Sequence, residues 1–461
     1  MSISAQLAVR ACSVQLSQLP AAAVRAAKWS LLDALGVSLA ATRLGEGCAG
    51  FEKLAEGTAG KCLLLGSGGT APAPLAALAN GALAHALDFE DSYDGAPVHA
   101  SAATVPAALA IAQHRGGISG PELIVALAVG TDLVCRLGLA LTVSPEQWGW
   151  YPPPILGTQG AATACGRLLG LSPKQMINAW SLALCQASCS NEFKNTADSV
   201  LRAVRDGFAA QGGLQAALLA ADNICGFEQP IEGRAGLFGL YAGGQYNRDR
   251  LLQDLDGVYE GAQVSYKLYP SCRGTHAFID AALQLRSESV TPDDIAATIL
   301  TGNTLMQMLG EPVERKRAPV TAIDAKFSAL FCFAQAMVYG RVDLDSFLPD
   351  ALDDAPVRRL ANRTLMVADP ALSVHDMSSG TTSVQLRSGA KRELHITNPR
   401  GGPHSPLSER ELVDKFSHCA ARALHPLNDA ARQLLIDTVL HLEDVQDLDS
   451  TLFRALRPGA V

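Results

Sequence analysis

The chain has 461 residues, of which 48% are hydrophobic, 18% charged and only 5% aromatic, and its formal net charge at neutral pH is −8. This length is typical of two or three domains with a sizeable buried core, and the composition excludes a disordered chain. The net negative charge argues against nucleic acid or an anionic membrane surface as a partner.

Cysteine usage and the lack of targeting signals indicate the compartment. The eleven cysteines are scattered and odd in number, which is typical of reduced thiols rather than of a disulfide framework. The opening residues, MSISAQLAVRACSVQ, do not place an apolar region behind a basic one, so no signal peptide is predicted. No apolar run reaches the ~18 residues that cross a bilayer. We therefore expect a cytoplasmic protein that does not bind membranes.

The first half of the chain is predicted to be helical. Pro20 suits a first helical turn, and the apolar residues after it recur at helical spacing. Similar stretches rich in Ala and Leu follow, most of them bounded by Gly or Pro. Helices are expected at residues 16–41, 72–87, 101–115, 121–142, 158–170, 174–189 and 205–222.

Beyond residue 265 the pattern changes to short runs that contain β-branched residues and partly alternate. A buried helix is expected at residues 321–340. Strands are predicted at residues 296–302, 363–369, 381–389 and 391–399, with a hairpin between the last two.

The last part of the chain returns to helix at residues 407–424, which open with a capping box from Ser408 to Glu411. We therefore predict a mainly α fold with two domains. A large helical domain, residues 1–268 and 406–461, is discontinuous, and a smaller α+β domain, residues 269–405, is inserted into it.

Common catalytic and cofactor signatures are absent. The chain contains no G-x-x-x-x-G-K-[ST], no G-x-S-x-G and no H-E-x-x-H sequence. Cys185 and Cys189 are four residues apart but have no nearby histidine partner, so we expect no metal site there.

The segment ALDFEDSYDGAPVHAS is the first of three polar stretches that interrupt the apolar pattern. It brings Asp88, Glu90, Asp91 and Asp94 together between two predicted helices and ends near His99. Two interpretations stay open: a solvated loop, or an acid/base site at a helix end.

The other two stretches each lie before a predicted helix. WGWYPPPILGTQGAA, residues 148–162, combines aromatic residues with a proline run, and the free N–H groups of a helix start bind anions. SYKLYPSCRGTH carries Lys267, Arg273 and His276, which suit carboxylate recognition, although an interdomain turn fits this stretch as well.

These stretches together resemble the MmgE/PrpD family. The resemblance rests on NGALAHALDFEDSY with VHASAATVPAALAIA, on GWYPPPILGTQGAATACGRLLGLS, on YKLYPSCRGTHAFIDAAL and on DAKFSALFCFAQAMVYGRV, which occur in the family's order along the chain. It implies a helical domain with an inserted α+β domain, a homodimer, no metal or organic cofactor, and a small di- or tricarboxylate bound in a cleft between the domains.

The resemblance also implies which residues form the site. Asp88 matches the aspartate of the family's D-F-D-D segment, Ser92 keeps a hydroxyl where relatives often have Thr, and His99 matches the histidine after it, across a loop one residue longer here. The remaining matches lie in the P-S-C-R-x-T-H motif and just before it: Lys267, Ser271, Arg273 and His276.

Two positions depart from the family pattern. Tyr151 stands where the usual G-W-H-P has histidine, and Arg202 stands where the usual T-K-R-L-H-x-G has lysine. Tyrosine, with an ordinary pKa of ~10, is a poor base at neutral pH, and arginine does not exchange its protons. Both departures put the usual proton-transfer chemistry in question but leave anion binding intact.

The resemblance implies a lyase or isomerase that moves a proton at a carbon next to a carboxylate, giving dehydration, decarboxylation or epimerisation. In this hypothesis His99 or His276 is the base, Tyr151 an acid and Asp88 an orienting residue. Arg202, Lys267 and Arg273 hold the substrate's carboxylates, and Ser271 and Ser92 line the site. Two alternatives stay open: the same fold acting on an unusual specialised metabolite, and a non-catalytic homodimer that binds a carboxylate.

Overall fold

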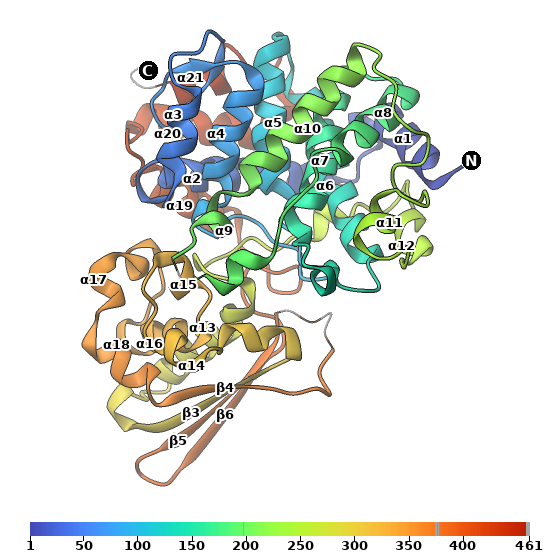
Figure 1. The fold of residues 1–461 in the computed structure, drawn as a ribbon. Helices are drawn as coiled ribbons and strands as arrows, with labels where there is room; N and C mark the ends of the chain where they lie inside the picture. Colours follow the sequence, from blue (N-terminus) through green and yellow to red (C-terminus); the bar gives the residue numbers. More distant parts are fainter. Residues whose placement is uncertain (197, 374–375, 377, 458–461) are drawn as a thin grey trace. The chain divides into compact units, whose positions relative to one another are not determined.

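The computed structural model describes residues 1–196, 198–373, 376 and 378–457. The chain divides into two compact units, each described here by itself. Unit 1 is formed by Met1–Phe193, Val200–Val264 and the chain from Ser408 on, and unit 2 by Lys194–Ser199 and Ser265–Leu407. Helices dominate both units (Figure 1), which confirms the predicted mainly α fold.

Unit 1 is helical apart from a short antiparallel pair of strands, β1 (Cys62–Leu63) and β2 (Thr70–Ala71). Its helices in chain order are α1 (Ile3–Ser13), α2 (Ala21–Leu44), α3 (Cys48–Ala55), α4 (Ala73–Ala86), α5 (Ala100–Arg115), α6 (Gly120–Ala140), α7 (Pro152–Leu168), α8 (Pro173–Leu184), α9 (Leu201–Val204), α10 (Asp206–Ala221), α11 (Leu237–Tyr241), α12 (Arg248–Leu252), α19 (Glu409–Ala420), α20 (Asp429–Leu440) and α21 (Leu452–Leu456).

The centre of unit 1 is a layer of closely packed helices in which α7 contacts α5 and α6, while α10 contacts α4, α7 and α8. Most of their inward residues are Ala, Gly, Val or Leu, so the helix axes approach closely. Helix α6 is long and apolar enough to cross a membrane, but 94% of its apolar window is buried inside the protein. Burial of that extent is typical of a core helix.

The crossing of α4 and α10 shows how close this packing is. Gly81 of α4 faces Gly207 of α10, and a Cβ added to Gly207 would lie 2.4 Å from the carbonyl oxygen of Leu78. Only glycine permits this approach. As a result, the first turn of α10 lies against the second half of α4, which carries His85.

Unit 2 contains a four-stranded sheet in the order β4-β3-β5-β6. Its strands are β3 (Ile295–Gly302), β4 (Thr364–Ala368), β5 (Gly380–Leu386) and β6 (Lys391–Ile396), with β3 and β4 parallel and the other pairs antiparallel. Its helices are α13 (His276–Ser287), α14 (Val313–Arg317), α15 (Ala322–Lys326), α16 (Ala329–Tyr339), α17 (Pro349–Leu352) and α18 (Ala355–Ala361).

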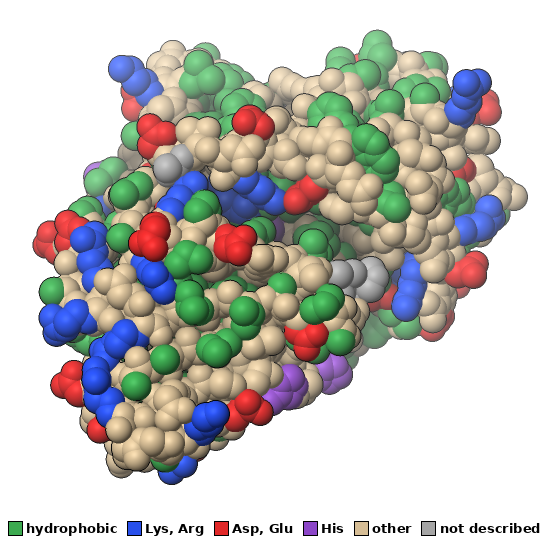
Figure 2. All heavy atoms as spheres, turned by 60° about the horizontal axis from the view of Figure 1, so that its bottom comes forward, with side chains coloured by type: hydrophobic (Ala, Val, Ile, Leu, Met, Phe, Trp, Pro, Cys, Tyr) green, Lys and Arg blue, Asp and Glu red, His purple; other side chains and the backbone are tan. Residues whose placement is uncertain are grey.

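The surface in Figure 2 carries Lys and Arg interspersed with Asp and Glu. Hydrophobic side chains are scattered across this face rather than gathered into one large patch. Part of the exposed apolar surface comes from the sheet of unit 2, where Ile299, Leu365 and Val367 are each nearly half exposed. Ile299 and Leu365 are paired across β3 and β4, and Val367 follows on the same face of β4, so these three form a small exposed apolar strip.

Several elements differ from their predicted bounds, and for two of them the reason is identifiable. Helix α7 begins at Pro152, not at residue 158, because the prolines occupy its first turn, where no N–H donor is required. The helix predicted at 321–340 is two helices, α15 and α16, because the chain turns at Phe327 and Ser328 caps the second of them through the Phe331 N–H.

Candidate functional site

The segment that joins α4 to α5 contains the first group of predicted site residues. Asp88 ends α4 with a φ of +49°, in the left-handed region, and its N–H donates to the His85 carbonyl over 2.8 Å. Aspartate tolerates this conformation better than most residues, although it costs energy. The turn redirects the chain away from the helix axis, so that Glu90 lies beside His85.

Burial excludes the solvated-loop interpretation. Asp88, Glu90 and Asp91 are fully buried, Ser92 is 5% exposed, and only Asp94 is half-buried. Buried carboxylates require hydrogen bonds or charged partners, because leaving them without these costs several kcal/mol. The carboxylates of Glu90 and Asp91 each have different partners and therefore different roles.

Glu90 connects two histidines. Its Oε1 lies 2.5 Å from His85 Nδ1 and 2.9 Å from His99 Nδ1, and the two imidazole rings meet edge to face with centroids 4.7 Å apart. His99 Nδ1 also lies 3.1 Å from the Asp91 carbonyl oxygen. Both atoms facing His99 Nδ1 only accept hydrogen bonds, so Nδ1 carries the proton and Nε2 keeps its lone pair.

Asp91 fixes the start of α5. Its Oδ1 accepts from the Ser101 N–H over 3.2 Å and its Oδ2 accepts from the Ser30 hydroxyl over 2.9 Å. Burial raises the pKa of Asp91, whereas the hydrogen bonds from Ser101 and Ser30 lower it. Asp91 thereby fixes the helix that follows His99 directly.

Lys415 of helix α19 also contacts this segment. Its Nζ donates to the Phe89 carbonyl over 2.6 Å, lies over the Phe89 ring and forms an ion pair of 2.6 Å with Asp33. Burial raises the pKa of Asp33 to about 6, although the charge of Lys415 lowers it. Lys415 thus connects α2, which carries Asp33, with the segment at Phe89, although the three residues are far apart in the sequence.

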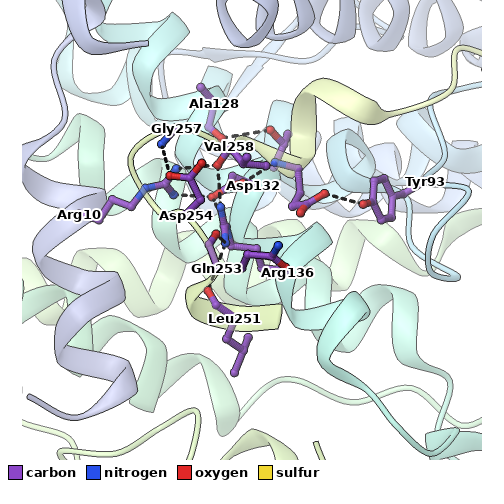
Figure 3. Close-up of polar contacts among 12 residues, drawn as sticks. Arg10, Tyr93, Ala128, Asp132, Arg136, Leu251, Gln253, Asp254, Gly257 and Val258 are labelled. Atoms are coloured by element: carbon purple, nitrogen blue, oxygen red, sulfur yellow. Dashed lines mark hydrogen bonds and ion pairs between the residues drawn. The ribbon is translucent and has the colours of Figure 1, made fainter. Parts of the chain in front are cut away.

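A second buried network, shown in Figure 3, supports the loop before His99. Tyr93 donates its hydroxyl proton to Glu260 over 2.7 Å, and the Glu260 N–H donates to Asp132 over 2.7 Å. Asp132 also pairs with Arg10 and with Arg136. Because the backbone N–H of Tyr93 donates to the Val98 carbonyl, this network fixes the residue that precedes His99.

Tyr151 and two arginines form a further part of unit 1. The guanidinium carbon of Arg202 lies 5.3 Å and that of Arg205 4.7 Å from the centre of the Tyr151 ring, and Phe193 meets this ring edge to face at 5.0 Å. Burial raises the pKa of Tyr151, while the two arginines lower it. The net rise keeps the phenol protonated at neutral pH.

Asp206 links this aromatic group to the histidine pair. Its Oδ2 lies 3.6 Å from Arg205 Nη2 and 3.9 Å from His85 Nδ1. Burial lowers the pKa of His85, and the charge of Arg205 lowers it further. The carboxylates of Glu90 and Asp206 raise it, but the net shift is downward. His85 is therefore neutral at physiological pH and donates its Nδ1 proton to Glu90.

Sequence analysis missed four of these residues as members of the site: His85, Glu90, Arg205 and Asp206. Glu90 lay inside the quoted segment, but its pairing with His85 depends on the turn at Asp88. The sequence signal for Arg205 and Asp206 was a doublet of opposite charge beside a glycine, in an otherwise apolar stretch.

The histidine predicted in unit 2 has the opposite tautomer to His99. His276 is fully buried at the start of α13, and its Nδ1 lies 3.3 Å from Arg273 Nη1. Arginine only donates, so Nδ1 accepts and the proton of the neutral ring lies on Nε2. The same guanidinium donates to the Arg400 and Pro399 carbonyls over 2.8 and 3.1 Å, which ties residues 399–400 to the histidine.

The other predicted residues of unit 2 are close to Arg273 and His276 in the sequence, and they are buried as well. Lys267 and Ser271 are both fully buried. The Ser271 hydroxyl lies 2.8 Å from that of Thr275, and the ring of Tyr269 meets His276 edge to face at 5.0 Å. The predicted contacts of Lys267, Ser271 and Arg273 with a substrate stay predictions.

Among the described residues, one group has the composition of a metal site: His85, Asp88, Glu90 and His99, whose ligand atoms all lie within 4.8 Å of one another. Two ligand atoms of one zinc or magnesium ion, each about 2.1 Å from it, lie about 3 Å or more apart. The 2.5 Å between His85 Nδ1 and Glu90 Oε1 is shorter and corresponds to a hydrogen bond. An ion that bound both of these atoms would have to move them apart.

Comparison with known proteins gives the family. The model of the MmgE/PrpD N-terminal domain matches residues 5–249, and that of the MmgE/PrpD C-terminal domain matches residues 269–442. The chain belongs to the MmgE/PrpD family.

Named relatives of this MmgE/PrpD protein include three decarboxylase sequences. A cis-aconitate decarboxylase-like protein of Aspergillus oryzae is 27% identical over 98% of this chain and 96% of its own length. Cis-aconitate decarboxylase of Homo sapiens is 26% identical, covering 85% of this chain and 81% of that enzyme. Cis-aconitate decarboxylase of Aspergillus terreus is 24% identical over 98% and 95%. These relatives support a lyase family whose substrates are carboxylates.

Proposed function

We propose that this MmgE/PrpD protein is a lyase that transfers a proton at the carbon next to a carboxylate of a small di- or tricarboxylate, using protein side chains alone. The relatives support a carboxylate lyase. The observation that carries the proposal further is the Glu90–His99 pair, which leaves one imidazole nitrogen of a slightly exposed histidine with its lone pair.

In this proposal His99 is the base. Its Nε2 takes a proton from the substrate carbon while Glu90 stabilises the imidazolium that forms. The histidine side chain is 14% exposed, whereas Glu90 is completely buried. The base therefore has access to a ligand, and its supporting carboxylate is shielded from water, where its charge acts most strongly.

His276 of unit 2 is suited to a different task, because a neutral imidazole is too weak an acid to give up its Nε2–H. With Nδ1 held as an acceptor by Arg273, that N–H can donate a hydrogen bond to negative charge that develops on a substrate. In a dehydration, the electron pair left on the substrate carbon forms the double bond as the hydroxyl leaves as water with the proton that His99 has taken. In a decarboxylation, carbon dioxide leaves and the imidazolium form of His99 protonates the carbon that keeps the electron pair.

The named relatives favour decarboxylation, which requires proton delivery, while the Glu90–His99 pair also suits proton removal. Tyr151 does not substitute for a histidine base, since burial raises its pKa. We therefore assign the proton transfers to His99, and infer that the ring of Tyr151 holds the neighbouring arginines by cation–π contact.

The experiment is turnover and hydrogen exchange in deuterated water, followed by NMR, with cis-aconitate, citrate, methylcitrate and iminodisuccinate. Product formation, or deuterium incorporation beside a carboxylate, supports the enzyme, and loss of both in His99→Ala and His276→Ala supports the assignment. A carboxylate that raises the melting temperature without exchange or turnover would instead indicate a non-catalytic binding protein.

We propose further that the protein is a homodimer, as the family resemblance implies. Unit 1 exposes several large apolar side chains on and just beyond α10, each 44–51% exposed: Phe208, Leu219, Ile224 and Phe227. Exposed apolar groups of this size favour association. Sedimentation at micromolar concentration tests this, and a monomer there would contradict it.

A further inference from the structure

We propose that Arg205 is an anion-binding residue of unit 1, and that it takes one carboxylate of a di- or tricarboxylate ligand. The inference rests on the proposed function for the class of ligand, and on the geometry of Arg205 for the place where the ligand binds. The family resemblance points to a different arginine of unit 1, Arg202, for this task.

Arg205 is a buried cation whose donors are only partly used. It lies between α9 and α10, is 2% exposed, and donates from Nη1 to the Arg202 carbonyl. Within the part of the chain that the structure describes, neither Nε nor Nη2 has a hydrogen-bond partner, and the carboxylate oxygen Asp206 Oδ2 lies 3.6 Å from Nη2. A buried guanidinium with two unused N–H groups is costly unless an acceptor completes it.

The unused pair of donors has the shape of a carboxylate. Nε–H and one Nη–H of a guanidinium lie on the same edge and point in parallel, so two oxygens of one carboxylate accept from both at once. A single carbonyl or hydroxyl would satisfy only one of them. The geometry therefore selects a planar, bidentate anion rather than a neutral ligand.

The ring of Tyr151 keeps the guanidinium in place. Arg205 stacks over it at 4.7 Å, and Phe193 packs against the ring at 5.0 Å. The opposite charge of Asp206 offsets part of the charge of Arg205, so the cation is held in the absence of a ligand without being fully neutralised. Tyr151, which stands where the family usually has histidine, thus holds the cation that would bind the anion.

Neighbouring groups are consistent with a ligand at this point. The charge of Asp88 acts on Arg205 in the same direction as that of Asp206, so these carboxylates hold the cation in place and a ligand must bind on the edge of the guanidinium that they leave open. The buried Ser92 hydroxyl, four residues further along the chain, has no hydrogen-bond partner among the described residues. Asp206 also approaches His85, which shares Glu90 with His99. An anion on Arg205 would therefore bind within the polar cluster that includes the proposed base.

The test measures binding and turnover separately. The variants are Arg205→Gln and Arg205→Lys, and the control is Arg410→Gln, which removes one charge from a side chain that is 90% exposed. Binding of tricarballylate, an unreactive tricarboxylate, is measured by calorimetry on the full chain. We expect Arg205→Gln to weaken tricarballylate binding about 30- to 100-fold. Arg205→Lys should weaken it about tenfold, because lysine keeps the charge but lacks the two parallel N–H donors of the guanidinium.

The outcomes separate this inference from the proposed function. Binding that is lost in Arg205→Gln but kept in Arg410→Gln supports the inference, even if the wild type turns over none of the substrates. Unchanged binding in both Arg205 variants overturns it, and so does the absence of tricarballylate binding by the wild type. If Arg205→Gln does not fold, Arg205→Lys decides: affinity equal to that of the wild type contradicts the bidentate contact.

Where a substrate is turned over, the KM values give a second readout. Arg205→Lys is expected to raise the KM for the tricarboxylate about tenfold while kcat changes less than threefold, because the contact is present in the ground state and the transition state alike. A loss confined to kcat would overturn the role in binding.

Discussion

Replacing Glu90 with glutamine tests the proposed base most directly. The substitution keeps the size of the side chain and an oxygen that accepts from the imidazoles, but it removes the charge that lies 2.9 Å from His99 Nδ1 and 2.5 Å from His85 Nδ1. Because Glu90 is completely buried, solvent does not compensate for the lost charge.

The expected loss follows from these contacts. A hydrogen bond to a charged group contributes about 1–2 kcal/mol more than a neutral one. The attraction between a carboxylate and an imidazolium ~4 Å apart is about 4 kcal/mol at an effective dielectric constant of ~20. The barrier should therefore rise by roughly 2–4 kcal/mol, which corresponds to a decrease in kcat of about 30- to 1,000-fold.

The assay is kcat on the best substrate of the panel, together with deuterium exchange at the substrate carbon. Glu409→Gln, on the exposed start of α19, is the matched control and should keep full activity. In the double variant Glu90→Gln, His99→Ala, no loss beyond that of His99→Ala is expected, since Glu90 acts through His99. A folded Glu90→Gln protein with the kcat of the wild type would refute the reasoning.

The remaining predictions concern stability and metal. Because the folded pKa of Asp33, about 6, lies above its ordinary value of 3.8, the contribution of this group to stability is fully present below pH ~4 and is lost as pH rises through 6, by at most ~3 kcal/mol; Asp33→Asn should remove this slope. Lys415→Met, which leaves Asp33 without its ion-pair partner, should lower the free energy of unfolding by about 3–5 kcal/mol. Gly207→Ala should cost roughly 1–3 kcal/mol, because the added Cβ would lie 2.4 Å from the Leu78 carbonyl oxygen. Treatment with EDTA should leave turnover unchanged, because the proposed chemistry uses side chains alone.

These stability measurements have a convenient probe, because all four tryptophans, Trp29, Trp148, Trp150 and Trp180, lie in unit 1. Urea unfolding followed by their fluorescence reports on that unit. Gly50→Ala is the control for Gly207→Ala, since a Cβ at Gly50 meets no atom within 4 Å, and it should leave stability equal or higher. A pH slope that persists in Asp33→Asn, an unaltered Lys415→Met or Gly207→Ala protein, or an EDTA-induced loss of turnover that zinc reverses would contradict the corresponding prediction.

Periodicity was enough to predict most of the fold. The apolar spacing after Pro20 corresponds to α2, and the alternating runs near residues 300 and 365 correspond to β3 and β4. Both signals are local, because the apolar residues of a buried helix face or strand face recur at a fixed spacing within a short stretch of sequence. The break between α15 and α16 was not visible in the same way, since the apolar residues continue through Phe327.

The candidate site was predicted only in part, because its decisive contacts are not local. Asp88 and His99 were identified as site residues, but the carboxylate that pairs with His99 is that of Glu90. The pairing of Glu90 with His85 requires the left-handed turn at Asp88, and the approach of Asp206 to His85 requires the glycine contact between α4 and α10. The spacing of residues along the chain does not show that these side chains come into contact.

The contact between Lys415 and the Phe89 carbonyl has a consequence for biosynthesis. A ribosome exposes residue 89 long before it adds residue 415, and unit 2 emerges between the two. Domains fold as units while the chain is being made, so unit 2 can fold before unit 1 acquires its last helices. Nascent chains that end before α19 should therefore lack an ordered segment at residues 88–91 and stay inactive. We expect the proposed activity to begin only after residues 409–420 have been made.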